Sequence, residues 1–190
     1  MQKNKCISSS PFFLVLFVWL LNTSVGFAQL KPLLDVPYVS TSPKVVEGML
    51  RLAQVKKGDV VYDLGCGDGR IVIAAVRDFH ATGVGFDLDP ERIAEANKIA
   101  AQAGLSESAK FVTADLFDVD LSKATVITLY LLPTVNMQLR SKLLALKPGT
   151  RIVSHAFNMG DWKPDKTEEI ENSTIYFGSS HKLVEQALNF

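Results

Sequence analysis

Residues 60–73 read Val60-Val61-Tyr62-Asp63-Leu64-Gly65-Cys66-Gly67-Asp68-Gly69-Arg70-Ile71-Val72-Ile73. An apolar run, an acidic residue, alternating glycines and a second apolar run follow one another. This order predicts a buried strand, a tight turn and the first turn of a helix. Glycine allows positive φ and lets a ligand lie against bare backbone, and we expect the amide groups at the helix start to face that ligand. The stretch therefore predicts a cofactor pocket.

Length and composition restrict the class of protein. The chain has 190 residues and is 47% hydrophobic, which suits one well-buried domain. Lys plus Arg equals Asp plus Glu at 20 each, so no overall field attracts nucleic acid or acidic lipid, and we expect neither as a partner. The two cysteines are Cys6, in the N-terminal segment, and Cys66, in the glycine turn. They support neither a disulfide framework nor a cysteine-based metal site, and we expect no metal. Separately, we expect the protein to be a monomer.

The first 28 residues have the pattern of an export signal. Lys3 and Lys5 precede an unbroken apolar run over residues 12–21, and Gly26-Phe27-Ala28 puts small residues where a signal peptidase reads them. The run is much shorter than the about 20 residues of a spanning helix, which favours a cleaved signal peptide over an uncleaved anchor. Either alternative carries the remaining domain across the membrane. We therefore expect an exported protein, periplasmic or secreted, or one anchored through residues 12–28, its only membrane contact.

The remaining chain divides into a cover segment with a helix, 29–58, and a larger domain, 59–190. Ser42 is the expected N-cap of the first helix, with Pro43 at its first position. Strands and helices then alternate from 59 to 157, which predicts a doubly wound, Rossmann-like, mostly parallel α/β sheet. A C-terminal antiparallel hairpin is expected after Trp162. The expected strands are 59–64, 83–87, 110–113, 124–130, 151–157, 166–171 and 174–177, and the expected later helices are 70–79, 90–103 and 135–146.

The acid beside the glycine turn distinguishes between cofactors. Asp63 stands two residues before Gly65, where an unpaired carboxylate would repel a pyrophosphate. The dinucleotide pattern Gly-x-Gly-x-x-Gly also fails, because its third glycine is replaced by Arg70. S-adenosylmethionine suits the site better, since it carries an ammonium and a sulfonium and no phosphate. An NAD-dependent oxidoreductase is the weaker alternative.

Two further acids follow neighbouring strands. Asp87 closes the second strand, where a carboxylate can accept hydrogen bonds from ribose hydroxyls, and Asp115 follows the third, near the expected adenine amino group. Singly, each could also be an Asp that caps a turn. Because carboxyl ends of parallel strands share one crevice, we expect a cofactor-binding set. Its members from this reasoning are Asp63, Gly65, Gly67, Asp87 and Asp115.

The stretch from Asp63 to Gly69 resembles the first motif of class I S-adenosylmethionine-dependent methyltransferases. Within that class, one small subfamily is similar to this chain in further stretches, among them Pro37-Tyr38-Val39, Leu131-Leu132-Pro133 and residues 146–155. That subfamily includes archaeal broad-specificity protein-lysine methyltransferases and the mitochondrial methyltransferase of the ATP synthase c-subunit lysine. The resemblance implies methylation of a lysine ε-amine on a protein, with Tyr38 and its neighbours folding over the cofactor.

One departure from that subfamily lies in the cover segment. Ser40 and Ser42 flank Thr41 where the subfamily tends to carry Pro-Thr-Pro, which bears on the rigidity of the cover. The expected export is a second departure, because S-adenosylmethionine is made in the cytosol. A small-molecule methyltransferase and a non-catalytic S-adenosylmethionine-binding module remain alternatives.

The acceptor side is expected after the fourth strand. Tyr130-Leu131-Leu132-Pro133 stands where methyltransferases acting on DNA bases and glutamine amides carry Asn/Asp-Pro-Pro-Tyr, which argues against those acceptors. Tyr130 is the candidate to line the acceptor slot, with core packing as the alternative. His155 is the candidate to touch the acceptor or accept its proton, with a hydrogen-bonded structural histidine as the alternative. A lysine acceptor must arrive neutral, so a partly desolvated, well-aligned slot would suffice.

Overall fold

The structure is a computed structural model that describes residues 39–180. The expected signal segment, residues 1–28, and Tyr38 lie outside the described residues. The helices are α1 Pro43–Leu52, α2 Arg70–Phe79, α3 Pro90–Gln102 and α4 Pro133–Leu144. The strands are β1 Val60–Leu64, β2 Thr82–Asp87, β3 Ala109–Thr113, β4 Val126–Leu129, β5 Arg151–His155, β6 Lys166–Ile170 and β7 Ser173–Ser179.

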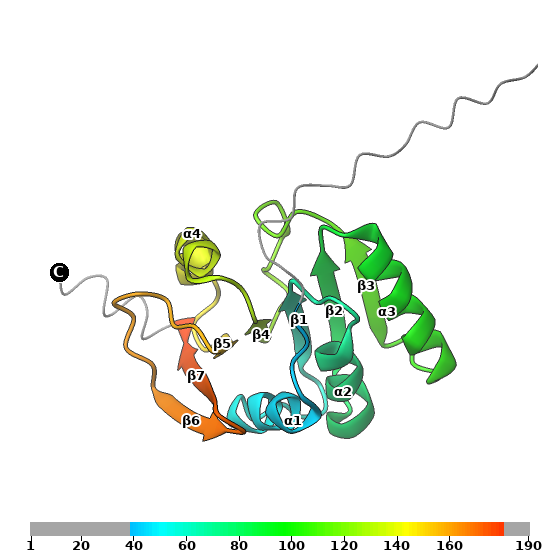
Figure 1. Ribbon diagram of the computed structural model, residues 1–190. Helices are drawn as coiled ribbons and strands as arrows, with labels where there is room; N and C mark the ends of the chain where they lie inside the picture. Colours follow the sequence, from blue (N-terminus) through cyan, green and yellow to red (C-terminus); the bar gives the residue numbers. More distant parts are fainter. Residues whose placement is uncertain (1–38, 181–190) are drawn as a thin grey trace, which may run out of the picture. The chain divides into compact units, whose positions relative to one another are not determined.

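The strands form one sheet in the order β3-β2-β1-β4-β5-β7-β6 (Figure 1). Strands β1 to β5 are parallel, β7 is antiparallel to β5, and β6 pairs with β7 as an antiparallel hairpin. The doubly wound, mostly parallel sheet and its C-terminal hairpin are confirmed. The strand order reverses between β1 and β4, and open α/β sheets bind ligands outside the carboxyl ends of strands at such a switch point. The glycine turn follows β1 there.

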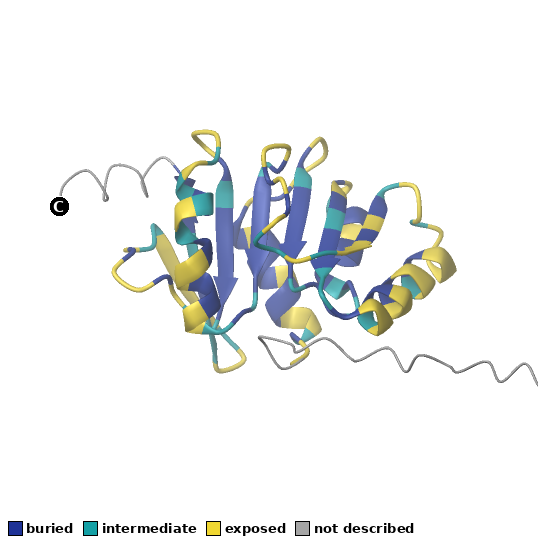
Figure 2. Cartoon of the chain, turned by 90° about the horizontal axis from the view of Figure 1, so that it is seen from above, coloured by how far each residue is buried: buried dark blue, intermediate teal, exposed yellow. Residues whose placement is uncertain are grey.

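Helices cover both faces of the sheet. On β1, Val61 packs with α1 and α2, whereas Tyr62 packs with α4 on the opposite face. On β4, Val126 and Ile127 alternate in the same way, as the two-residue period of a strand requires. Helix α3 packs beside α2 against Phe111 of β3. Figure 2 shows the buried strands between helices whose outer faces are exposed.

The predicted ends of the fourth and fifth strands need correction. The fourth strand ends at Leu129, one residue before Tyr130, and the fifth ends at His155, because Ala156 takes a left-handed φ of 63°. The third strand ends at Thr113 as predicted, and Asp115 lies in the following turn. There the Asp115 side chain accepts a hydrogen bond from the Phe117 amide at 2.9 Å, and this local bond competes with strand pairing.

The start of α1 is as predicted. Ser42 is the N-cap, its Oγ accepts a hydrogen bond from the Val45 amide at 3.3 Å, and Pro43 is the first helical residue. The same hydroxyl donates to Glu171 in the β6–β7 turn at 2.5 Å. Within residues 39–180 no helix is both long and apolar enough to cross a membrane.

A polar network fastens the end of α1 to the amino ends of the strands. Arg151 donates to the carbonyls of Ala53 and Gln54 at 2.9 and 2.8 Å and forms an ion pair with Asp59. Thr125 also donates to Asp59, at 2.9 Å. Burial alone would raise the pKa of Asp59, but the hydrogen bonds, that from Arg151 foremost, hold it below its ordinary value. This network belongs to the scaffold, at the opposite end of the strands from the glycine turn.

Candidate functional site

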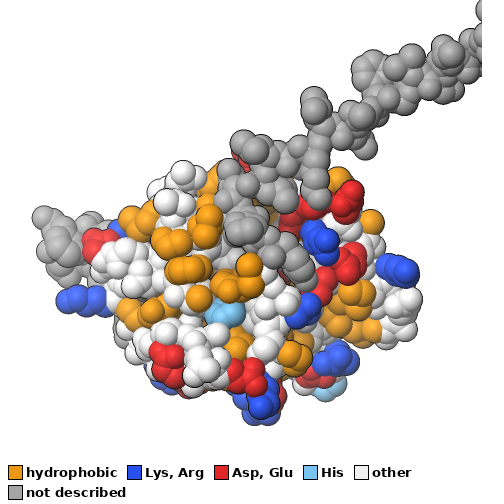
Figure 3. Space-filling view, in the orientation of Figure 1, with side chains coloured by type: hydrophobic (Ala, Val, Ile, Leu, Met, Phe, Trp, Pro, Cys, Tyr) orange, Lys and Arg blue, Asp and Glu red, His pale blue; other side chains and the backbone are white. Residues whose placement is uncertain are grey.

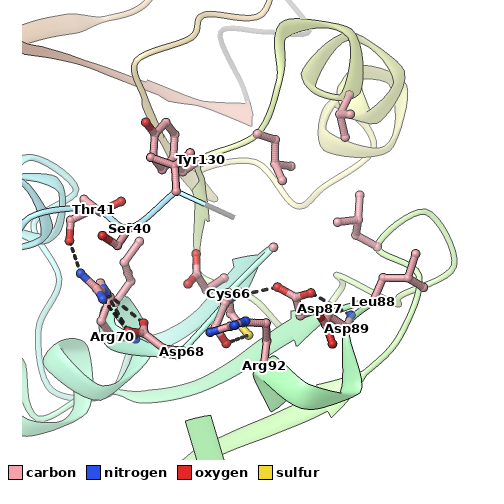
Figure 4. Close-up of a pocket in the computed structure, with 18 of the residues that line it drawn as sticks. Ser40, Thr41, Cys66, Asp68, Arg70, Asp87, Leu88, Asp89, Arg92 and Tyr130 are labelled. Carbon is pink, nitrogen blue, oxygen red and sulfur yellow. Dashed lines mark hydrogen bonds and ion pairs between the residues drawn. The ribbon is translucent and has the colours of Figure 1, made fainter. Parts of the chain in front are cut away.

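A pocket lies at the carboxyl ends of β1, β2 and β4, between the glycine turn and the described end of the N-terminal segment (Figure 4). Residues 39–41 of that segment form part of its wall. His155 does not line the pocket. Six residues predicted from the sequence do line it, namely Asp63, Gly65, Gly67, Asp87, Asp115 and Tyr130.

The glycine turn requires its glycines. Gly65, Gly67 and Gly69 have φ values of 79°, 52° and 78°, in the left-handed region that other residues rarely adopt. A Cβ atom on Gly65 would lie 2.6 Å from Cδ2 of Leu131, which also lines the pocket. A side chain at Gly65 would therefore be strained and would push Leu131 out of place.

Several amide groups of the glycine turn donate to acceptors within the protein. The Gly67 amide donates to the Asp87 carboxylate at 2.8 Å. The other paired amides of the turn donate to acceptors of the protein as well, namely those of Gly65, Cys66, Gly69 and Arg70. Amide groups engaged in this way are not available to cradle a phosphate. This finding also argues against a dinucleotide.

Asp63 is the buried acid of the pocket, with 2% of its surface exposed. Its Oδ1 accepts a hydrogen bond from the Thr128 hydroxyl at 2.5 Å, and no other described residue donates to the carboxylate. Burial raises the pKa of Asp63 to about 7, the Thr128 bond opposes this rise, and the charges of Asp87 and Asp68 add to it. A cation in the pocket would favour the ionised form. The site therefore fits an ammonium-bearing cofactor.

The other acids give the pocket an excess of negative charge. Asp87 accepts from the Gly67 and Asp89 amides, at 2.8 and 2.9 Å, and so joins the turn to the start of α3. Each carboxylate oxygen can accept a further bond, so Asp87 keeps capacity for ribose hydroxyls. The pocket wall contains five Asp residues against two arginines, Arg70 and Arg92. This balance attracts a cationic ligand and repels phosphate.

Tyr130 and His155 lie together at the ends of β4 and β5. Their ring centroids are 3.9 Å apart with an interplanar angle of 36°. The buried His155 also forms a hydrogen bond between its Nδ1 and the Thr41 hydroxyl at 3.2 Å, and burial lowers its pKa. Tyr130 thus faces the pocket, and His155 contacts the side of the ring and the cover segment.

Two residues of the site are not predicted from the sequence. In the sequence, Arg70 only argues against a dinucleotide. In the structure, its side chain donates to the Thr41 carbonyl at 2.7 Å and to both oxygens of Asp68 (Figure 4). Thr128 lies opposite Asp63 in the parallel pairing of β1 and β4. Thr128 could be found only by knowing the strand order, because β4 lies beside β1 in the sheet although two strands separate them along the chain. No sequence signal reveals the contact of Arg70 with Thr41.

Residues 63–166 match the family model described as the ANTKMT methyltransferase domain. The chain belongs to this methyltransferase family. The methyltransferase is 47% identical over 147 residues to a protein-lysine N-methyltransferase of Saccharolobus islandicus, which covers 74% of this chain and 91% of that protein. It is 37% identical over 148 residues to the mouse adenine nucleotide translocase lysine N-methyltransferase, covering 77% of this chain and 64% of the mouse protein.

Solved structures agree with this membership. A crystal structure described as an RNA methyltransferase from Salinibacter ruber, in complex with S-adenosyl-L-homocysteine, has a TM-score of 0.73 and 51% identity. The match covers 74% of this chain and 93% of the Salinibacter chain. The chain is thus an S-adenosylmethionine-dependent methyltransferase, and the NAD alternative is set aside. When bound, S-adenosylmethionine supplies an electrophilic methyl group on its sulfonium.

Proposed function

We propose that this methyltransferase N-methylates lysine side chains of a protein. The observation that carries the proposal is the 47% identity to the Saccharolobus protein-lysine N-methyltransferase across 91% of that protein. The chain spans 64% and 53% of the two mouse lysine methyltransferases it matches, those for the adenine nucleotide translocase and for the c-subunit of ATP synthase. The identity of the methylated protein is therefore open to experiment.

The pocket wall suits a lysine acceptor. Leu131 and Val135 give it an apolar part beside Tyr130. An ammonium has an ordinary pKa of about 10.4, and apolar surroundings lower it, which raises the share of the nucleophilic neutral amine. We propose that Tyr130 lines the acceptor slot and aligns the amine, and that His155 supports the Tyr130 ring. Alignment and desolvation then supply most of the acceleration.

We propose that Asp63 faces the cationic part of the bound cofactor and that Asp87 holds its ribose, with Gly65 and Gly67 leaving room for it. We also propose that Asp115, which lies on the pocket wall, accepts a hydrogen bond from the adenine amino group. Tyr38, directly before the described residues, is proposed to continue the cover formed by residues 39–41.

An RNA acceptor is the competing proposal, because the Salinibacter structure is described as an RNA methyltransferase. The charges of the described residues favour protein over RNA. On the face seen in Figure 3, basic side chains are interspersed with acidic ones and form no continuous basic stripe. RNA binding depends on Lys and Arg contacts to phosphate, and the acidic pocket wall would repel the phosphates flanking a target base.

The experiment is methyl transfer from labelled S-adenosylmethionine into a cell lysate, with Asp63→Ala as the inactive control. We expect label in protein that is sensitive to protease and resistant to ribonuclease. Label in RNA or only in small molecules would contradict the lysine acceptor while leaving methyl transfer intact. Cofactor binding without any transfer would indicate the non-catalytic module.

We further propose that residues 1–28 export the protein, with an anchor through residues 12–28 as the alternative, and that the domain is monomeric. The basic, apolar and small-residue order of the segment supports export. A reporter fused to residues 1–28 should be active outside the cytosol and should lose the segment on processing. A reporter retained in the cytosol would contradict export.

A further inference from the structure

Residues 41 and 42 are fixed at three points to three different parts of the domain. The Thr41 carbonyl accepts a hydrogen bond from Arg70 at the start of α2, at 2.7 Å. The Thr41 hydroxyl is hydrogen-bonded to His155 at the end of β5. The Ser42 hydroxyl donates to Glu171 in the β6–β7 turn. The described N-terminal segment is therefore held at its base, directly before α1.

The cover segment changes from exposed to buried at this base. Val39 is 57% exposed and Thr41 is 4% exposed, although both line the cofactor pocket. The position of Val39 and Ser40 on the pocket wall thus depends on how Thr41 is held. Of the bonds that described residues make to Thr41, only that from Arg70 comes from a residue next to the glycine turn.

Arg70 joins two walls of the pocket. Its Nη1 donates to the Thr41 carbonyl, while Nε and Nη2 donate to Asp68 at 2.9 and 2.5 Å. Asp68 is part of the glycine turn and also lines the pocket. In Figure 4 Arg70 lies between Thr41 and Asp68, from the cover segment and the glycine turn. Its guanidinium charge is compensated by Asp68, which favours a role in holding the two walls over direct recognition of the cofactor.

We propose that Arg70 is a positioning residue for the cofactor, which by tying the Thr41 carbonyl to Asp68 places residues 39–41 against bound S-adenosylmethionine. The bond is made by an ionised donor, the strong kind of hydrogen bond. Its loss should loosen the wall formed by residues 39–41, while the bond between Thr41 and His155 keeps the acceptor side at Tyr130 in place. The affinity for S-adenosylmethionine and S-adenosylhomocysteine should then fall, while the methyl transfer step stays intact.

The test compares Arg70→Met, which keeps the aliphatic stem, with Arg70→Lys, which keeps a cation but cannot bond both partners as a fork. The matched control is Arg77→Met on the same helix, because Arg77 is exposed and pairs with its neighbour Asp78. Titration calorimetry should show a Kd for both ligands raised about tenfold or more in Arg70→Met, less in Arg70→Lys and not in Arg77→Met. KM for S-adenosylmethionine should rise in parallel, and kcat should not fall.

A double-mutant cycle with Val39→Gly separates positioning from direct contact. If Arg70 acts through residues 39–41, the Kd of the double variant for S-adenosylmethionine should be no higher than that of whichever single variant, Arg70→Met or Val39→Gly, binds more weakly. Multiplied effects would mean that Arg70 acts on the cofactor directly and would overturn the proposal. An unchanged Kd in Arg70→Met, or a lower kcat at unchanged KM, would overturn it as well. Should Arg70→Met fail to fold, the same comparison is made with Arg70→Lys.

Discussion

The Thr128 hydroxyl donates to Oδ1 of Asp63 at 2.5 Å across the pairing of β4 and β1, inside the buried floor of the cofactor pocket. This is the only described side chain that donates to Asp63. A buried carboxylate with one neutral donor is poorly stabilised in its ionised form. The pocket is therefore suited to a cation.

Replacing the charge of Asp63 should weaken cofactor binding. Asp63→Asn keeps the shape and can still bond Thr128, but it removes the attraction to the cofactor ammonium. We expect Kd for S-adenosylmethionine to rise about tenfold to a hundredfold, since hydrogen bonds to charged groups contribute about 1.5–3 kcal/mol. Calorimetric titration measures this, with the exposed Asp120→Asn as control. Equal Kd values for Asp63→Asn and the unmodified protein would refute the assignment of Asp63.

Cofactor affinity should depend on pH through Asp63, whose pKa is about 7 without ligand. The cofactor binds the ionised form, so below pH 7 the apparent Kd should rise, approaching tenfold per pH unit. Without cofactor, the folded state holds this proton more tightly than the unfolded state, so the free energy of unfolding should fall as pH rises from about 4 to about 7. Cofactor should therefore raise Tm more at pH 8 than at pH 6. A pH-independent Kd in Asp63→Asn is the control.

Thr128 should tune that pH dependence. Thr128→Val has nearly the same shape and removes the only described donor to Asp63. The pKa of Asp63 should rise further, because the bond from Thr128 lowers it. The midpoint of the affinity-against-pH curve should shift upward and the Kd at pH 7 should increase. A midpoint that stays in place or moves downward would show that the bond does not stabilise the carboxylate.

Gly65 should not tolerate a side chain. Gly65→Ala places Cβ 2.6 Å from Leu131 in a backbone with φ of 79°, and a left-handed backbone costs a non-glycine residue about 1–2 kcal/mol. We expect a lower Tm together with weaker cofactor binding. Combining it with Leu131→Ala removes the clash but leaves the strain, so binding should recover more than Tm. If binding and Tm both recovered, or if neither did, the separation of the clash with Leu131 from the backbone strain at Gly65 would be contradicted.

The Asp59–Arg151 pair should affect stability and leave the pocket intact. Arg151→Met leaves the buried Asp59 without its ion-pair partner, which typically costs about 3–5 kcal/mol. Because the pKa of Asp59 is lowered in the folded state, this contribution is present above its ordinary value of 3.8 and is lost as pH falls through the lower folded value. Urea unfolding at pH 7 and at low pH measures both effects. Kd for S-adenosylmethionine should not change.

The sequence predicted the elements well because its signals are local. The alternation of apolar runs with glycine and acid placed β1, α2 and β2 within a residue or two, and Ser42-Pro43 marked the start of α1. Contacts between distant parts of the chain left no such signal. Arg70 meets Thr41, 29 residues earlier, and Thr128 meets Asp63, 65 residues earlier. The contact of Thr128 depends on the order of strands in the sheet, and that of Arg70 depends on where the segment before α1 lies, neither of which the sequence alone states.

The departure of the cover segment from Pro-Thr-Pro also acquires a physical reason. Proline stiffens a chain through its ring. Here Ser42, at the position of the second proline, caps α1 and donates to Glu171. Side-chain hydrogen bonds thus fix the base of the cover where the subfamily tends to carry proline.

The most direct test of the account is the identity of the methylated atom. The full-length protein is incubated with labelled S-adenosylmethionine and a cell lysate, and the labelled material is digested and analysed by mass spectrometry. We expect methyl groups on lysine ε-nitrogens, and none when Asp63→Ala replaces the unmodified protein. Label confined to nucleotides or to small molecules would contradict it.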